Sequence, residues 1–161
     1  TTAFKYKGPA AVRYPRGSGP NTSVSSDLDG IEIGKARIIR EGESKVVFLN
    51  FGALLDKAIE VSEKMDFTLI DMRFVKPLDQ EILKKYLSKA DYFVSLEDGS
   101  IAGGAGSAVQ EFCSIESIDI KSILLGIPDR FIEHSSREEM LESAGLSVAK
   151  ILDRLKPLLG K

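Results

Sequence analysis

Apolar and polar positions alternate along the chain in a way that predicts strands and helices in turn. Short, nearly continuous apolar runs are typical of strands that are buried on both faces of a sheet. Apolar residues that recur every three or four positions predict helices with one buried face. The strand-like runs are 36–40, 45–51, 67–72, 92–96 and 118–125, with weaker ones at 10–14 and 31–33.

The helix-like stretches each carry an apolar stripe at helical spacing. The stripes are Leu54, Ala58, Val61 and Met65; Ile82, Leu83, Tyr86 and Leu87; Ala108, Val109, Phe112 and Cys113; Met140, Leu141 and Ala144; and Ile151, Leu152, Leu155 and Leu159. Asp79 and Ser147 are placed to cap two of these helices, and Ser135 and Ser136 begin two overlapping capping boxes for a third, which Gly145 ends.

Strands that alternate with helices predict a three-layer α/β/α domain. We expect 45–51 and 67–72 to lie parallel, joined by a right-handed crossover. The turn at 41–43 predicts that 36–40 pairs with 45–51 as a hairpin, which places 36–40 at an edge. The sheet is therefore predicted to be mostly parallel, with an antiparallel edge strand.

The first thirty residues have a different character. Residues 10–14 look like a lone strand with no partner, and 17–30 are rich in Gly, Ser, Asn, Thr and Asp, as linkers are. We therefore divide the chain into the end of a preceding domain (1–16), an interdomain linker (17–30) and the α/β domain (31–161). Since Thr1 begins as though in mid-domain, we expect a piece of a longer protein whose opening segment contacts the domain or a neighbouring chain.

Gly103, Gly104 and Gly106 separate the strand at 92–96 from the helix that follows. Glycine-rich turns at helix starts either let the backbone pack closely or bind phosphate through free N–H groups. Glu97 and Asp98 lie at the end of the strand, where their charge would repel a phosphate, and there is no Walker lysine. We therefore interpret the glycines as a structural hinge and the two carboxylates as turn and helix-terminus electrostatics.

Composition narrows the range of partners. The chain is 43% hydrophobic and 29% charged with a formal charge of −2, and it has no basic cluster. Nucleic acid and anionic membrane are therefore not expected as partners. The longest apolar run falls well short of a membrane span, and we expect a cytoplasmic location. The one cysteine, Cys113, is expected to be a buried small hydrophobe.

Three other features are candidates for chemistry. His134 is the only histidine, and because helix-capping serines follow it, we expect a polar loop or interface role rather than catalysis. Asp71 and Arg73 end a strand where open α/β sheets bind ligands, but an internal ion pair is an equal interpretation. No metal site is expected from the protein ligands.

Arg13 and Arg16 form the strongest candidate site, within Arg13-Tyr14-Pro15-Arg16-Gly17. Two guanidinium groups beside a fixed turn suit an oxyanion such as a sugar phosphate. A surface ion pair is the alternative for the same residues.

Five segments together resemble 1-deoxy-D-xylulose-5-phosphate synthases, in particular the C-terminal third of such enzymes. They are 11–17 (AVRYPRG), 49–52 (LNFG), 71–79 (DMRFVKPLD), 97–107 and 126–129 (GIPD). The first and third, in this order, are the specific ones. The glycine run alone would also fit transketolases and 2-oxo acid dehydrogenase β subunits.

The resemblance implies a fold and an activity. Residues 1–16 would end a pyrimidine-binding domain, and 31–161 would be a transketolase C-terminal domain. The family condenses pyruvate with glyceraldehyde 3-phosphate, with thiamine diphosphate and Mg²⁺, to give 1-deoxy-D-xylulose 5-phosphate and CO₂ for isoprenoid, thiamine and pyridoxal synthesis. Its substrate-phosphate arginine corresponds to Arg16, with Arg13 as a second candidate.

The same resemblance implies what this stretch does not supply. The family's cofactor and magnesium ligands and its catalytic residues lie in preceding domains, so no catalytic, cofactor or metal residue is assigned here. We expect a homodimeric enzyme in which this part provides packing and dimerisation, and an isolated chain that neither binds thiamine diphosphate tightly nor turns over substrate. A stand-alone nucleotide-binding module, built on the glycine hinge, is the rival hypothesis.

Overall fold

The structure is a computed structural model, and it describes residues 1–14 and 28–158. Its elements, in chain order, are α1 (Thr2–Lys5), β1 (Arg37–Arg40), β2 (Val46–Phe51), α2 (Leu55–Met65), β3 (Thr68–Asp71), α3 (Gln80–Leu87), β4 (Tyr92–Ser100), α4 (Ala105–Ile115), β5 (Lys121–Ile127), α5 (Arg137–Ser143), α6 (Val148–Leu155) and the short 3₁₀ helix η1 (Lys156–Leu158). The five strands form one sheet in the order β1-β3-β2-β4-β5.

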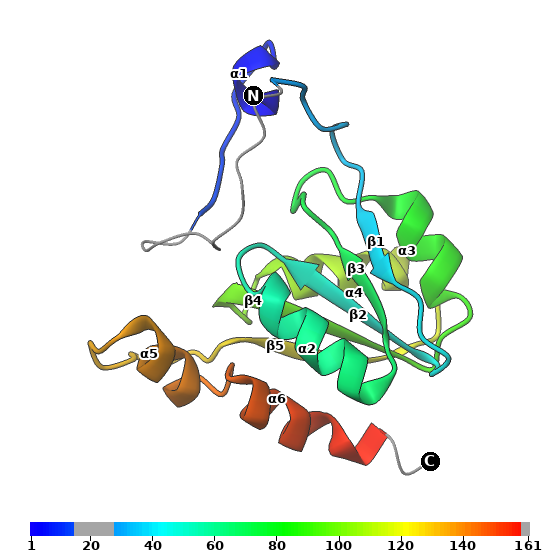
Figure 1. The fold of residues 1–161 in the computed structure, drawn as a ribbon. Coiled ribbons are helices and arrows are strands. Elements are labelled where there is room, and N and C mark those ends of the chain that lie inside the picture. Colours follow the sequence, from blue (N-terminus) through cyan, green and yellow to red (C-terminus); the bar gives the residue numbers. More distant parts are fainter. Residues whose placement is uncertain (15–27, 159–161) are drawn as a thin grey trace.

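The predicted three-layer architecture is confirmed. Figure 1 shows α2 and α6 on one face of the sheet and α3 and α4 on the other. One core joins Phe48 and Val61 to Ile151, and the other joins Leu49 to Leu83 and Val109. Neighbouring residues of β2 thus enter opposite cores, as the alternation of side chains along a strand requires. All six residues of β2 are buried.

The pairing of the edge strand differs from the prediction. β1 is antiparallel and lies at the edge, as expected, but it pairs with β3 and not with β2. β2 is flanked on both sides by parallel partners, β3 and β4. The predicted hairpin is therefore wrong, because a strand buried along its whole length takes the centre of the sheet and the half-exposed β1 takes the rim.

The strand order creates a switch point between β2 and β4. From β2 the chain passes through α2 to β3 on one side, and from β4 it passes through α4 to β5 on the other side. The two helices lie on opposite faces, so the carboxyl ends of β2 and β4 form the topological switch point of the sheet. In open α/β sheets, this is where ligands bind.

The predicted helix caps are confirmed. The Asp79 carboxylate accepts hydrogen bonds from the N–H of Ile82 at 3.2 Å and from the N–H of Ala36 at 2.9 Å. Ser147 caps α6 through the N–H of Lys150 at 3.4 Å. Of the two overlapping capping boxes, the one formed by Ser136 and Glu139 closes around the start of α5.

The capping box makes part of the stability depend on pH. Hydrogen bonds from the hydroxyls of Ser135 and Ser136 and from the Ser136 N–H lower the pKa of Glu139 to about 2. Its pKa in the unfolded chain is about 4.3, so the stabilisation is fully present above that pH and is lost as pH falls toward 2. We expect Glu139→Gln to melt below the parent chain at about pH 6, with the difference closing at about pH 2.

Thermal unfolding at both pH values checks this expectation. Glu111→Gln, at an exposed position on α4, is the matched control because it removes the same charge away from any helix start. A difference for Glu139→Gln that persisted in acid would contradict the capping explanation.

Several local predictions need correction. Residues 10–14 form no strand and are exposed, because no neighbouring strand is available to pair with them. Residues 31–33 are also outside any strand. The short helix α1 is present in the structure, although the pattern of apolar residues does not predict it. β4 continues past Leu96 to Ser100, and β5 is shifted to Lys121–Ile127.

Within 1–14 and 28–158, no helix has the length and apolar content to cross a membrane.

Candidate functional site

The start of α4 is occupied by a side chain of the protein itself. The buried carboxylate of Glu97 accepts hydrogen bonds from the N–H groups of Ala105 and Gly106, both at 3.1 Å. These are the first two residues of α4, where free N–H groups and the helix dipole attract an anion. The structural interpretation of the glycine turn is therefore supported, and a phosphate would have to displace Glu97.

Arg13 lies at the carboxyl ends of β2 and β4. Its Nη1 donates a charge-assisted hydrogen bond to Oδ1 of Asp98, near the end of β4. A Cβ atom at Gly52, just beyond β2, would lie 3.6 Å from Nη1, and one at Gly99 would lie 3.7 Å from Nη2. The guanidinium thus rests against two glycines at the ends of the two central strands.

A second arginine approaches the same carboxylate. Nη2 of Arg137, the first residue of α5, lies 4.0 Å from Oδ2 of Asp98. The Asp98 side chain is 14% exposed, against 57% for Arg13 and 36% for Arg137. One largely buried carboxylate therefore lies between two guanidinium groups, and the three groups together carry a net charge of about +1.

A hollow of about 380 Å³ adjoins this cluster. Asp98, Arg130 and Arg137 line it on the polar side, and Ile127, Phe131 and Leu141 are among its apolar lining. The Arg130 guanidinium donates to the carbonyl of Ser143 at 2.7 Å, so it is held in place by α5. The carboxyl edge of β4 and β5 is thus both concave and rich in arginine.

Arg16 lies outside the described residues, as does most of the predicted linker. Arg16 is the residue that we expect to bind the substrate phosphate most directly.

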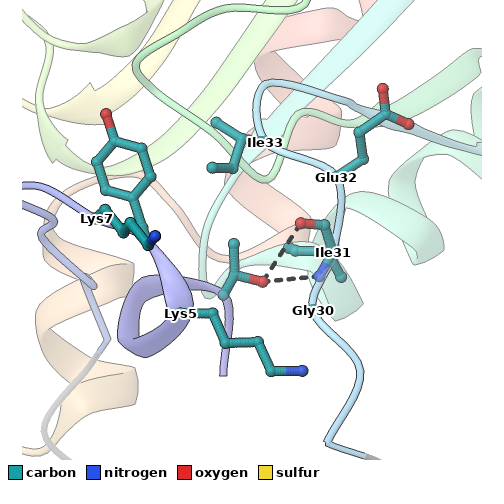
Figure 2. A pocket seen from close by; sticks show the side chains of 8 residues that line it. Lys5, Lys7, Gly30, Ile31, Glu32 and Ile33 are labelled. Atoms are coloured by element: carbon teal, nitrogen blue, oxygen red, sulfur yellow. Dashed lines mark hydrogen bonds between the residues drawn. The ribbon is translucent and has the colours of Figure 1, made fainter.

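The opening segment does contact the domain, as expected. Besides the Arg13–Asp98 pair, the Thr2 hydroxyl accepts from the N–H of Ile31 at 2.7 Å (Figure 2). A shallow hollow of about 670 Å³ lies beside that contact, lined by residues of the opening segment and by Gly30–Ile33.

The other candidates lie away from this cluster or have structural roles. His134 is exposed in the loop before α5. Asp71 pairs with Arg37 at 3.2 Å, so it does take part in an ion pair, but not with Arg73. Arg73 instead donates to the carbonyl of Lys35 at 2.7 Å.

Cys113 is buried on α4, as predicted, and burial raises the pKa of its thiol. No group of three metal-ligating side chains occurs in the part of the chain that the structure describes.

Sequence reasoning does not find the partners of Arg13. It interprets Asp98 as a turn residue and Arg137 only as part of a helix start. The available indication is that Asp98 follows a buried strand, which places it at the carboxyl edge of the sheet, where sites form. Nothing local in the sequence joins it to a residue 85 positions earlier.

Comparisons with known proteins agree with this fold. The sequence model of the transketolase C-terminal domain matches residues 34–151. A protein of Hahella chejuensis named 1-deoxy-D-xylulose-5-phosphate synthase is 47% identical over 97% of this chain and 24% of its own length. One of the same name from Stutzerimonas stutzeri is 48% identical over 94% of this chain and 24% of its length. The chain therefore spans about a quarter of the length of these relatives.

Two solved structures give the same result. A split-gene transketolase, described as an inactive beta4 tetramer, superposes with a TM-score of 0.74 at 28% identity, covering 90% of this chain and 47% of that one. Transketolase from Campylobacter jejuni gives a TM-score of 0.57 at 18% identity, covering 83% of this chain and 20% of that one, which is a likeness of fold. With a family match that covers most of its length and a sheet of the same architecture, the chain belongs to the transketolase C-terminal domain family.

Proposed function

We propose that the chain is the C-terminal part of a 1-deoxy-D-xylulose-5-phosphate synthase. In this proposal, the whole enzyme condenses pyruvate with glyceraldehyde 3-phosphate and releases CO₂, as a cytoplasmic homodimer. The observation that carries it is an identity of 47–48% to proteins of that name over 94–97% of this chain. Identity at this level extends beyond the shared domain fold, because it includes the opening segment that precedes residues 34–151.

The arginine cluster supports a role in binding the phosphorylated substrate. A guanidinium has five N–H donors, and the bond from Arg13 to Asp98 uses one of them. The remaining donors can bind phosphate oxygens in pairs, at the edge of the sheet where α/β proteins bind ligands. We assign the phosphate of glyceraldehyde 3-phosphate to Arg16, with Arg13 as the second ligand.

The described residues do not fit thiamine diphosphate or Mg²⁺. The N-terminus of α4, which could otherwise bind a diphosphate, is occupied by the Glu97 carboxylate. Residues 1–14 and 28–158 hold no group of three side chains that could ligate the metal. We therefore assign both groups to the rest of the longer enzyme, and we expect titration calorimetry to detect no stoichiometric binding of the cofactor to this chain alone. The contribution of this domain would be packing and dimer surface.

A stand-alone nucleotide-binding module is the less supported function. It would need the glycine turn to present free N–H groups to a phosphate, and Glu97 accepts from two of them. ATP or NAD would raise the melting temperature of such a module. We expect no such shift.

Arg16→Ala in the full-length enzyme tests the proposed function. We expect the KM for glyceraldehyde 3-phosphate to rise about tenfold, since one charge-assisted contact is lost, while the KM for pyruvate stays within about twofold. Steady-state kinetics with each substrate varied in turn measure both values. Arg154→Ala, at an exposed position on α6, is the matched control. An unchanged KM for the aldehyde would remove Arg16 from the site, and absence of 1-deoxy-D-xylulose 5-phosphate as product would overturn the assigned reaction.

A further inference from the structure

The switch point at the ends of β2 and β4 holds a residue from outside the sheet. In sheets of this topology, ligands bind at this point. Here Arg13, from the segment before the domain, lies across it, with Gly52 on the β2 side and Asp98 and Gly99 on the β4 side. In Figure 1, the segment that follows α1 runs toward these strand ends. The opening segment and the domain therefore meet at the topological switch point.

Asp98 is well placed to fix the guanidinium. It lies near the end of β4, in the irregular stretch between Leu96 and Ser100, and the residues around it are paired with the neighbouring strands, Glu97 with Phe51 of β2 and Ser100 with Ile127 of β5. Its two carboxylate oxygens face different arginines, Oδ1 toward Arg13 and Oδ2 toward Arg137. The hydrogen bond to Arg13 and the nearby charge of Arg137 limit the rotation of the carboxylate, and a side chain on a strand is a more accurate support than one on a loop.

Two glycines lie beneath the guanidinium. Gly52 has a φ of 90°, which favours glycine, and a Cβ atom there would be in ordinary contact with Nη1 of Arg13 at 3.6 Å. A Cβ atom at Gly99 would lie 3.7 Å from Nη2. The guanidinium therefore lies close to the backbone at the ends of β2 and β4.

We propose that Asp98 is a positioning residue that holds Arg13 over the ends of β2 and β4 and so presents its remaining N–H donors to the phosphate of the aldehyde substrate. This inference rests on the proposed function and adds to it a residue of the α/β domain itself. Asp98 does not touch the substrate. Its effect is exerted through Arg13, and Arg137 offsets its negative charge so that the cluster still attracts an anion.

The physical advantage is preorganisation. An arginine side chain that samples many rotamers loses this freedom when it binds phosphate, and this loss weakens binding. An arginine that Asp98 already holds has lost the freedom before the substrate arrives. The benefit is therefore expected in the KM for the phosphorylated aldehyde and not in the reaction of pyruvate.

The test compares variants of the full-length enzyme. Asp98→Asn keeps the shape but removes the charge, and we expect it to raise the KM for glyceraldehyde 3-phosphate about fivefold, with the KM for pyruvate unchanged within about twofold. Asp98→Glu retains the carboxylate, and we expect its KM for glyceraldehyde 3-phosphate to stay close to that of the parent enzyme. Asp153→Asn, at an exposed ion pair on α6, is the control for charge removal.

A double-mutant cycle shows whether Asp98 acts through Arg13. We expect Arg13→Ala to raise the aldehyde KM and the addition of Asp98→Asn to raise it no further. The proposal is overturned if Arg13→Ala leaves this KM unchanged, if Asp98→Asn does so, or if the two effects simply add. Should Asp98→Asn fail to fold, Asp98→Ala takes its place in the cycle, with the same expected and contradicting results.

The same experiments distinguish this inference from the proposed function. If Arg16→Ala raises the aldehyde KM while the Arg13 and Asp98 variants do not, only the positioning role fails. If the parent enzyme does not form 1-deoxy-D-xylulose 5-phosphate, the proposed function fails first.

Discussion

Gly104→Ala is expected to lower the free energy of unfolding by about 3 kcal/mol or more, because the added methyl group has no space. A Cβ atom at this position would lie 2.1 Å from the carbonyl oxygen of Ser100 and 2.5 Å from Oε1 of Glu97. The first is a backbone atom at the end of β4, so relief requires the strand and the start of α4 to move apart. Such a movement would also break the hydrogen bonds from α4 to Glu97.

Gly103→Ala is the matched comparison. Gly103 has a φ of 68°, but a Cβ atom added there would have no other atom within 4 Å, so alanine meets only backbone strain, worth about 1 kcal/mol. Urea unfolding of the two variants beside the parent chain measures the difference. If both variants lost the same free energy of unfolding, the turn would need glycine for its backbone conformation alone, and the close approach of Gly104 to β4 would be unimportant.

The stretch from Tyr92 to Phe112 shows what local sequence can predict. The sequence predicts a buried strand, an acidic turn, a glycine hinge and a helix with an apolar stripe there. β4 and α4 are found with the hinge between them, but Glu97 and Asp98 lie within β4 and not in a turn. Each of these elements is determined by residues that are close in sequence. The expectation of helix-terminus electrostatics is also correct for Glu97, which is only eight positions before Ala105.

The pairing of β1 shows what local sequence could not predict. A short turn between two strand-like runs favours a hairpin, but the burial of all six residues of β2 requires partners on both of its sides. The same mistake hides the partner of Asp71. Arg37 lies directly opposite Asp71 in the β1–β3 register, and this cross-strand pair cannot be expected when β1 is placed beside β2.

The candidate site was predictable only in part. Arg13 stands out because two arginines flank a tyrosine and a proline, a local pattern with a chemical meaning. Asp98 and Arg137 become its partners only through the strand order, which brings the ends of β2, β4 and β5 together at one edge. Topology decides such contacts, and the pattern of apolar residues predicts topology less well than it predicts the elements themselves.

Glu97→Ala is expected to lower the free energy of unfolding by about 3 kcal/mol, through lost hydrogen bonds and not through lost packing alone. Glu97 is 7% exposed, and its carboxylate accepts from the first two N–H groups of α4. A buried carboxylate is tolerated here because those donors and the helix dipole compensate for its desolvation. Alanine would remove the acceptor and leave both donors buried without it.

Glu97→Gln separates charge from shape. Glutamine keeps one oxygen acceptor but replaces the other with an NH₂ group that faces an N–H donor, so we expect a loss close to that of alanine. Glu63→Ala, at an exposed position on α2, controls for removal of a glutamate from the surface and is expected to change stability by less than about 0.5 kcal/mol. Urea unfolding of the three variants measures these values. If Glu97→Gln were as stable as the parent chain, the carboxylate charge would be unnecessary, and the start of α4 would again be a candidate for binding an external anion.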